Sequence, residues 1–152
     1  MEAPCEIVIE RVMNAPVRSV WRAWLDRDRI AKWWGPAGFR STVRTLDVRA
    51  GGRFEVVMHG PDGTDYPNVY LFDEVEEARR LVYTNIGSRE FGLAPFQSTF
   101  VMEGIGETTR AVLTARFSSR EDRRRHVEDF HAIEGAEQLL GRLEEEARLG
   151  PE

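Results

Sequence analysis

The spacing of apolar residues predicts a strand followed by two short helices at the start of the chain. Residues 6–12 are rich in β-branched side chains and put Ile7 and Ile9 on one face and Glu6 and Glu10 on the other, which is typical of a strand. Residues 17–25 carry apolar side chains at three- and four-residue steps, the stripe of an amphipathic helix. We expect Asp26 or Asp28 to cap a second short helix, which ends at the Gly-Pro pair at 35–36.

From about residue 39 to residue 117 the period of the pattern changes to two. The breaks between the alternating runs are short and mostly rich in glycine, proline or charged residues. The predicted strands are 40–49, 53–59, 68–76, 80–86, 96–103 and 108–117. Connections this short leave no room for crossover helices, so the pattern predicts an antiparallel meander.

The end of the chain is predicted to be one long helix, from about residue 119 to residue 149. Ser118 with Glu121 three residues later matches a capping box, and apolar residues then recur at helical spacing. Gly135 and Gly141 lie inside this helix, where we expect close packing or a bend.

These elements predict an α+β fold in a single domain over residues 1–152. Seven antiparallel strands would curve around the long C-terminal helix, with the two short helices placed after the first strand. Such a sheet rarely closes completely on its helix, so we expect a cavity between the two and look for function there.

Composition narrows the classes of partner. The chain has 152 residues, and 21 basic against 26 acidic residues give a net charge of −5, which disfavours a general nucleic-acid binder. Cys5 is the single cysteine, so no intrachain disulfide can form and a reducing compartment is expected. We find neither a signal peptide nor an apolar run of the roughly 18 residues that span a bilayer, and we expect a cytoplasmic protein.

Several motifs, in order, resemble a known family. They are ERVMNAP (10–16), VWRAW (20–24), WWGP (33–36), DVRAGGRF (47–54), PDG (61–63), RLVYT (80–84) and EGAEQLLGRL (134–143). Together they resemble the activator-of-heat-shock-protein-90-ATPase-like family over nearly the whole chain. The resemblance implies the helix-grip architecture of the START-like (SRPBCC) superfamily, which includes the birch pollen allergen and whose members hold apolar molecules between sheet and helix.

The chain departs from the family pattern at three places. Tyr70 stands where the family usually has glycine, the pair at 77–78 replaces two prolines, and Ala136 replaces an aromatic residue. In the eukaryotic members this domain is the second of two, and the first binds the chaperone strongly.

Large apolar side chains are the candidates for the cavity lining. Trp21, Trp24 and one of Trp33 and Trp34 are expected to anchor the short helices, with Trp34 the most suited to a pocket because it lies at a helix end. The nine predicted ligand-binding residues are Trp34, Phe54, Met58, Tyr70, Phe72, Tyr83, Phe96, Phe100 and Phe130.

A few polar residues are candidates for orienting a ligand. His59, Tyr66 and Tyr83 lie on predicted strands or beside them. His59 alternates in phase with Arg53 and Glu55, which favours a solvent-facing position. 

Arg11 shares the phase of the apolar Ile7 and Ile9. We expect a structural ion pair there, with a carboxylate such as Asp47.

The sequence carries no strong catalytic or metal-binding motif. Cys5 has no evident histidine partner. Glu128 and His131 have the spacing of a carboxylate-bridged metal site but lack a second copy, and His126 lies five residues before His131, off its helix face. We expect neither a metal ion nor a cofactor.

Three functions remain open at this point. The first is a helix-grip protein that binds an apolar or aromatic small molecule or a lipid, without chemistry of its own. The second is an enzyme of the cyclase, dehydratase or hydrolase kind, which would need an inward polar pair such as Tyr83 with His59 or Glu55. The third, implied by the resemblance, is a chaperone-interaction module.

Two alanine substitutions are expected to separate these functions. Exchanging Phe100 or Phe130 for alanine should weaken ligand binding and preserve the fold if the cavity is the functional site, and should leave partner binding unchanged in a chaperone module. The strand edges and short helices would also permit a homodimer, and the sequence leaves the oligomeric state open.

Overall fold

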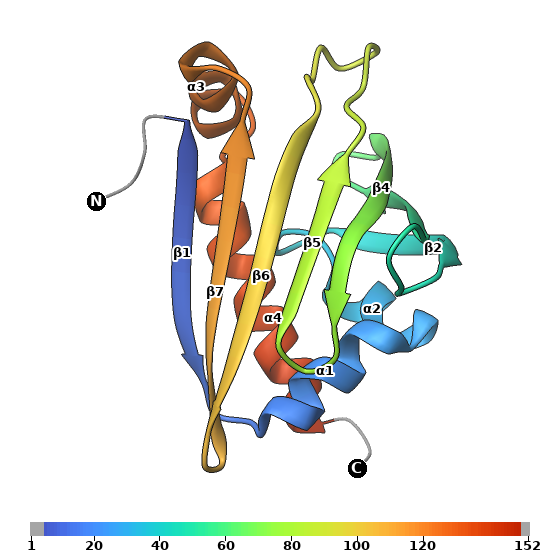
Figure 1. The fold of residues 1–152 in the computed structure, drawn as a ribbon. Coiled ribbons are helices and arrows are strands. Elements are labelled where there is room, and N and C mark those ends of the chain that lie inside the picture. The colour runs from blue at the N-terminus through green and yellow to red at the C-terminus, as the bar shows by residue number, and fades with distance from the viewer. Residues whose placement is uncertain (1–4, 150–152) are drawn as a thin grey trace.

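The computed structural model describes residues 5–149, which form seven strands and four helices (Figure 1). The strands are β1 (Glu6–Met13), β2 (Arg40–Leu46), β3 (Arg53–His59), β4 (Asp65–Glu76), β5 (Arg80–Asn85), β6 (Phe96–Ile105) and β7 (Thr108–Phe117). The helices are α1 (Val17–Leu25), α2 (Arg27–Trp33), α3 (Arg120–Glu128) and α4 (Ala132–Leu149).

All seven strands form one antiparallel sheet in the order β1-β7-β6-β5-β4-β3-β2. The predicted meander is therefore confirmed, and β1 joins it beside β7, the last strand in the chain. β2 runs across the direction of β1 and β7, which shows how strongly the sheet curves (Figure 1). The limits of β3 and β7 agree with the sequence prediction, whereas β4 begins three residues early and β2 ends three residues early.

The two short helices begin and end where local chemistry requires it. Pro16 precedes the first turn of α1, where its missing N–H leaves no helical hydrogen bond unmade. Asp26 caps α2, because its Oδ1 accepts hydrogen bonds from the backbone N–H groups of Asp28 at 2.8 Å and Arg29 at 3.3 Å. At the other end, the N–H of Trp34 donates to the carbonyl of Ile30 at 2.9 Å.

The predicted single C-terminal helix is wrong in one respect: it is two helices. α3 ends at Glu128 and α4 begins at Ala132, and between them His131 adopts a left-handed backbone conformation with φ 53°. The predicted cap is also displaced by one residue, because the Ser119 side chain accepts from the N–H of Asp122 at 3.1 Å.

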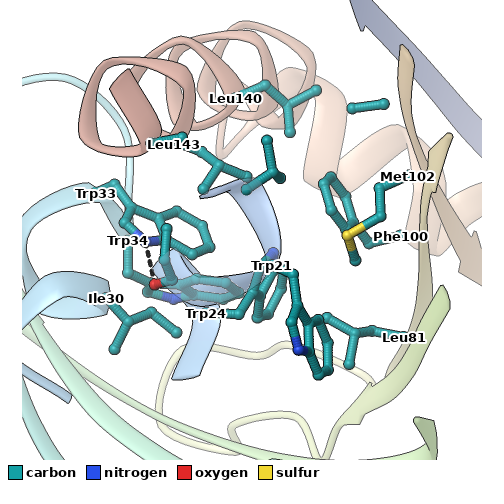
Figure 2. Close-up of a cluster of buried hydrophobic side chains, with 14 of the residues drawn as sticks. Trp21, Trp24, Ile30, Trp33, Trp34, Leu81, Phe100, Met102, Leu140 and Leu143 are labelled. Atoms are coloured by element: carbon teal, nitrogen blue, oxygen red, sulfur yellow. Dashed lines mark hydrogen bonds between the residues drawn. The ribbon is translucent and has the colours of Figure 1, made fainter. Parts of the chain in front are cut away.

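The helices α1, α2 and α4 pack together, and tryptophans fill the space between them and the sheet (Figure 2). The rings of Trp24 and Trp33 meet edge to face with centroids 5.0 Å apart. Trp33 Nε1 donates a hydrogen bond to the carbonyl of Ala23 at 2.9 Å, which links the two short helices. Leu140 and Leu143 of α4 complete this core, so the expected anchoring role of the tryptophans is confirmed.

The ion pair of Arg11 is present, but its partner differs from the one expected. Arg11 Nε donates to Glu144 Oε1 of α4 at 2.8 Å, while Asp47 pairs with Arg49. The Arg11 guanidinium lies over Gly141, where a Cβ would be in ordinary contact with it at 3.8 Å. The pair therefore ties β1 to α4. 

Among residues 5–149, no helix is both long enough and apolar enough to cross a membrane.

Candidate ligand-binding site

A cavity lies between the concave face of the sheet and the helices at the C-terminal end. It has two adjoining lobes, a smaller one of about 240 Å³ and a larger one of about 570 Å³. The lobes share part of their walls, including Pro36, Met58, Tyr70, Phe96 and Phe130. A volume of this size suits a drug-sized molecule.

The smaller lobe is walled by inward-facing residues of the strands at one edge of the sheet. Side chains alternate across a strand, so Ile9 of β1 and Leu113 and Ala115 of β7 face the lobe. Their sequence neighbours face outward, where Glu10 pairs with Arg110 at 2.7 Å. This wall is almost entirely apolar.

Aromatic rings form the next part of the wall of the smaller lobe. Trp34 lies with its ring centroid 5.3 Å from that of Tyr70 and 6.3 Å from that of Tyr83. Behind them Phe54 packs edge to face on Trp34, with centroids 4.9 Å apart. The position of Trp34 follows from its place at the end of α2, which turns its indole toward the sheet.

The two tyrosines keep their hydroxyl protons at any physiological pH. Burial raises the pKa of Tyr70 to about 12, although side-chain hydrogen bonds with Asn85 and Trp34 oppose the rise. Burial also raises the pKa of Tyr83, and the neighbouring Tyr70 adds to the shift. Ser98, opposite Tyr83 in the β5–β6 register, lines the smaller lobe as well. These hydroxyls are neutral hydrogen-bonding groups in an apolar wall.

The larger lobe is more polar, and its amides are already engaged. Asn85 Nδ2 donates to Asn68 Oδ1 at 2.9 Å, and Asn85 Oδ1 accepts from the N–H of Gly87 at 2.8 Å. The acidic residues Asp129 and Glu134 also line this lobe. The described walls of both lobes contain no lysine or arginine, so no fixed positive side chain faces the cavity.

His126 of α3 lies in the wall that both lobes share. Its ring is surrounded by those of Phe117, Phe96 and Phe130, with centroid distances of 4.5, 4.9 and 6.2 Å. The side chain is buried, and this burial lowers its pKa below the ordinary value of 6.5. Nδ1 lies 2.9 Å from the carbonyl oxygen of Asp122, whereas Nε2 has no hydrogen-bond partner among the described residues.

The sequence interpretation missed His126, because it weighed this residue only as a zinc ligand. A signal was present: His126 precedes Phe130 by four residues, the spacing of side chains on one helix face.

Six of the nine predicted lining residues do line the cavity. They are Trp34, Met58, Tyr70, Tyr83, Phe96 and Phe130. Phe54, Phe72 and Phe100 line neither lobe and are buried in the core. Phe100, for example, packs against Trp24 of α1 with centroids 5.4 Å apart. These three phenylalanines lie on the inward face of the sheet, but helices and other aromatic rings cover the part of the face where they lie.

Of the polar residues proposed to orient a ligand, some line the cavity and others do not. Tyr66 lines the larger lobe, but His59 lines neither. His59 faces outward as expected, with its ring nitrogens 2.7 Å from Thr42 Oγ1 and 2.7 Å from Asp65 Oδ1. Glu55 lies outside both lobes and pairs with Arg53. The inward pair of Tyr83 with His59 or Glu55 is therefore not assembled.

Within residues 5–149, no three histidine, cysteine, aspartate or glutamate side chains are grouped so that they could hold a metal ion. 

A curved antiparallel sheet that holds a C-terminal helix over an apolar cavity defines a helix-grip protein. The family described as "Activator of Hsp90 ATPase homolog 1-like protein" matches residues 14–148. The chain belongs to this family. No curated protein is significantly similar to it.

Solved bacterial structures share the fold. A protein from Nitrosomonas europaea is 26% identical, with a TM-score of 0.86 over 97% of each chain. A protein from Mycobacterium smegmatis is 26% identical, with a TM-score of 0.82 over 98% of this chain and 93% of the other. An AHSA1 protein from Silicibacter pomeroyi is 22% identical, with a TM-score of 0.74 over 95% of this chain and 98% of the other.

Proposed function

We propose that the protein binds an apolar or aromatic small molecule in the cavity between the sheet and α4. The observation that carries the proposal is the cavity itself, whose walls are mainly apolar and carry a few polar groups. This is the usual composition of a small-molecule site, in which apolar area supplies affinity and polar groups fix orientation.

The inward apolar residues support this proposal because the protein's own packing does not fully cover them. Leu113, Ala115 and Leu139 are only partly buried although they face the interior. A ligand in the smaller lobe would cover them, and each Å² of apolar surface removed from water contributes about 25 cal/mol.

The tyrosines, the asparagines and the polar pair considered from the sequence favour binding over catalysis. The tyrosines are neutral, Asn68 and Asn85 of the larger lobe are hydrogen-bonded to each other, and the acid–base pair considered from the sequence is not assembled. A general acid or base needs a proton-transfer partner at the reacting atom.

A pair of substitutions on one strand tests the proposal. Ala115→Trp places an indole in the smaller lobe, whereas Thr114→Trp places the same group on the outer face of β7. We expect wild type and Thr114→Trp to bind N-phenyl-1-naphthylamine with a rise in its fluorescence, and Ala115→Trp to bind at least tenfold more weakly. Urea unfolding of both variants controls for loss of fold.

Native mass spectrometry of the freshly purified protein gives an independent readout. A reproducible extra mass that is lost on denaturation would identify an occupant, and Ala115→Trp should lack it. Equal probe binding by all three proteins would contradict the proposal. If wild type bound no probe, and Hsp90 bound strongly and equally to wild type and Ala115→Trp, a chaperone-interaction module would replace the proposed ligand-binding function.

A further inference from the structure

His126, a residue that lines both lobes of the cavity, has an unused hydrogen-bond acceptor. The residue is 7% exposed, and Nε2 is buried without a hydrogen-bond partner among residues 5–149. Buried polar atoms nearly always have partners, since an unsatisfied one costs free energy. An orphaned nitrogen on a side chain that lines the cavity therefore points to a group that the ligand brings.

The hydrogen bond of the other ring nitrogen, Nδ1, shows whether the ligand's group must be a donor or an acceptor. The carbonyl oxygen of Asp122 can only accept, so Nδ1 of His126 carries the proton that it donates at 2.9 Å. In the neutral ring Nε2 is then a lone-pair acceptor. Burial lowers the pKa of His126 and so favours the neutral ring. The missing partner is a donor, an O–H or N–H group.

The side chains around the cavity argue against an anionic donor. Neither wall contains lysine or arginine among the described residues, which disfavours a carboxylate such as that of a fatty acid. The rings of Phe96, Phe117 and Phe130 around His126 favour a flat aromatic body beside the donor.

We propose that the ligand is a neutral hydroxyl-bearing aromatic compound, a phenol or a related alcohol, whose O–H donates to His126 Nε2. This inference rests on the proposed function and narrows its ligand class. The rings that surround His126 must yield slightly to admit the hydroxyl. Phe130 is the most exposed of them at 39% and lies in the link between α3 and α4.

Two matched compounds test the inference, 1-naphthol and 1-methoxynaphthalene, which differ in the hydroxyl proton. We expect wild type to bind 1-naphthol about tenfold more tightly in competition with the fluorescent probe, the factor that one neutral hydrogen bond typically supplies. In His126→Phe the ratio should fall to about one, while 1-methoxynaphthalene still binds. His59→Phe, which changes a histidine outside both lobes, should keep the wild-type ratio.

A second measurement needs no variant. The ¹⁵N resonance of His126 Nε2 in wild type should shift when 1-naphthol is added and stay in place with 1-methoxynaphthalene. If neither compound binds wild type, the proposed function fails and the inference fails with it. If both bind equally, or if His126→Phe keeps the preference, the cavity function stands and only the role of His126 is overturned.

Discussion

Two phenylalanines that the sequence treats alike have different surroundings. Phe100 of β6 is 0% exposed and packs against Trp24 in the core. Phe130 is half-exposed in the link between α3 and α4, where it lines both lobes of the cavity. One ring holds the fold together, and the other contributes to the cavity wall.

Alanine at these two positions should therefore have different effects. Phe100→Ala is expected to lower the free energy of unfolding by about 3–5 kcal/mol, because it leaves a void in the core. Phe130→Ala should cost less than about 1 kcal/mol and instead weaken binding of the fluorescent probe. Urea unfolding and probe titration measure both effects.

This replaces the expectation from the sequence that either exchange leaves the fold intact. Equal losses of stability in the two variants would contradict the assignment of Phe100 to the core and Phe130 to the cavity wall.

The strand pattern could predict which face a side chain occupies but not what covers it. Tyr70 and Tyr83 lie on the inward face, and Trp34, at the end of α2, lines the smaller lobe with them. Phe54 and Phe100 have the same phase, yet other side chains cover them. That distinction depends on how α1 and α2 dock, which is a long-range property absent from any local pattern.

At the scale of elements, one side chain of α4 holds the end of α2 in place. The Arg142 guanidinium donates to the carbonyls of Lys32 at 2.7 Å, Gly35 at 2.9 Å and Pro36 at 3.0 Å. These carbonyls follow the last turn of α2 or lie within it, where helical partners run out. Because Pro36 lines both lobes, the same contact positions part of the cavity wall.

Arg142→Ala should lower the free energy of unfolding by about 2 kcal/mol, because it removes charge-assisted hydrogen bonds to three carbonyls. Probe affinity should fall as well, because the wall at Pro36 loses its support. Glu145→Ala changes an exposed residue of the same helix and should stay within about 0.5 kcal/mol of wild type in urea unfolding. No difference between the two variants would refute this role of Arg142.

The break between α3 and α4 shows why element limits were harder to predict than element types. Phe130 and Ile133 continue the helical spacing across the break, so periodicity alone cannot reveal it. The left-handed conformation of His131 produces the break, and histidine is not a residue that signals it as glycine would. Similarly, Arg11 pairs with Glu144 rather than Asp47 because the fold brings α4 beside β1.

At the scale of the whole molecule, the free energy of unfolding should decrease in two separate steps as the pH is lowered. Burial lowers the pKa of His126 in the folded state. As the pH falls below 6.5, this histidine is therefore protonated in the unfolded chain before it is protonated in the folded one, and the free energy of unfolding decreases. The pKa of Glu10 is lowered by its hydrogen bond with Arg110, and that of Glu121 by its hydrogen bond with Arg124. These two glutamates stabilise the folded state above pH 4.5, the ordinary pKa of glutamate. This stabilisation is lost as the pH falls from 4.5 through their lowered folded-state pKa values.

The measurement is urea unfolding from pH 8 to pH 3 in wild type and His126→Gln. The variant should lose the upper step and keep the lower one. A wild-type stability that stays constant between pH 7 and pH 5.5 would contradict the shift of His126.

The pairing of the first strand with the last has a consequence for synthesis on the ribosome. Glu6 of β1 and its β7 partner Arg116 are 110 residues apart in the chain, the largest separation within the β1–β7 register that loop closure must overcome. At about 5–20 residues per second, β1 waits for roughly 5–20 s before its partner has been made. During that interval its apolar face is a segment that nascent-chain chaperones can bind, and the sheet gains this edge only after β7 has been synthesised.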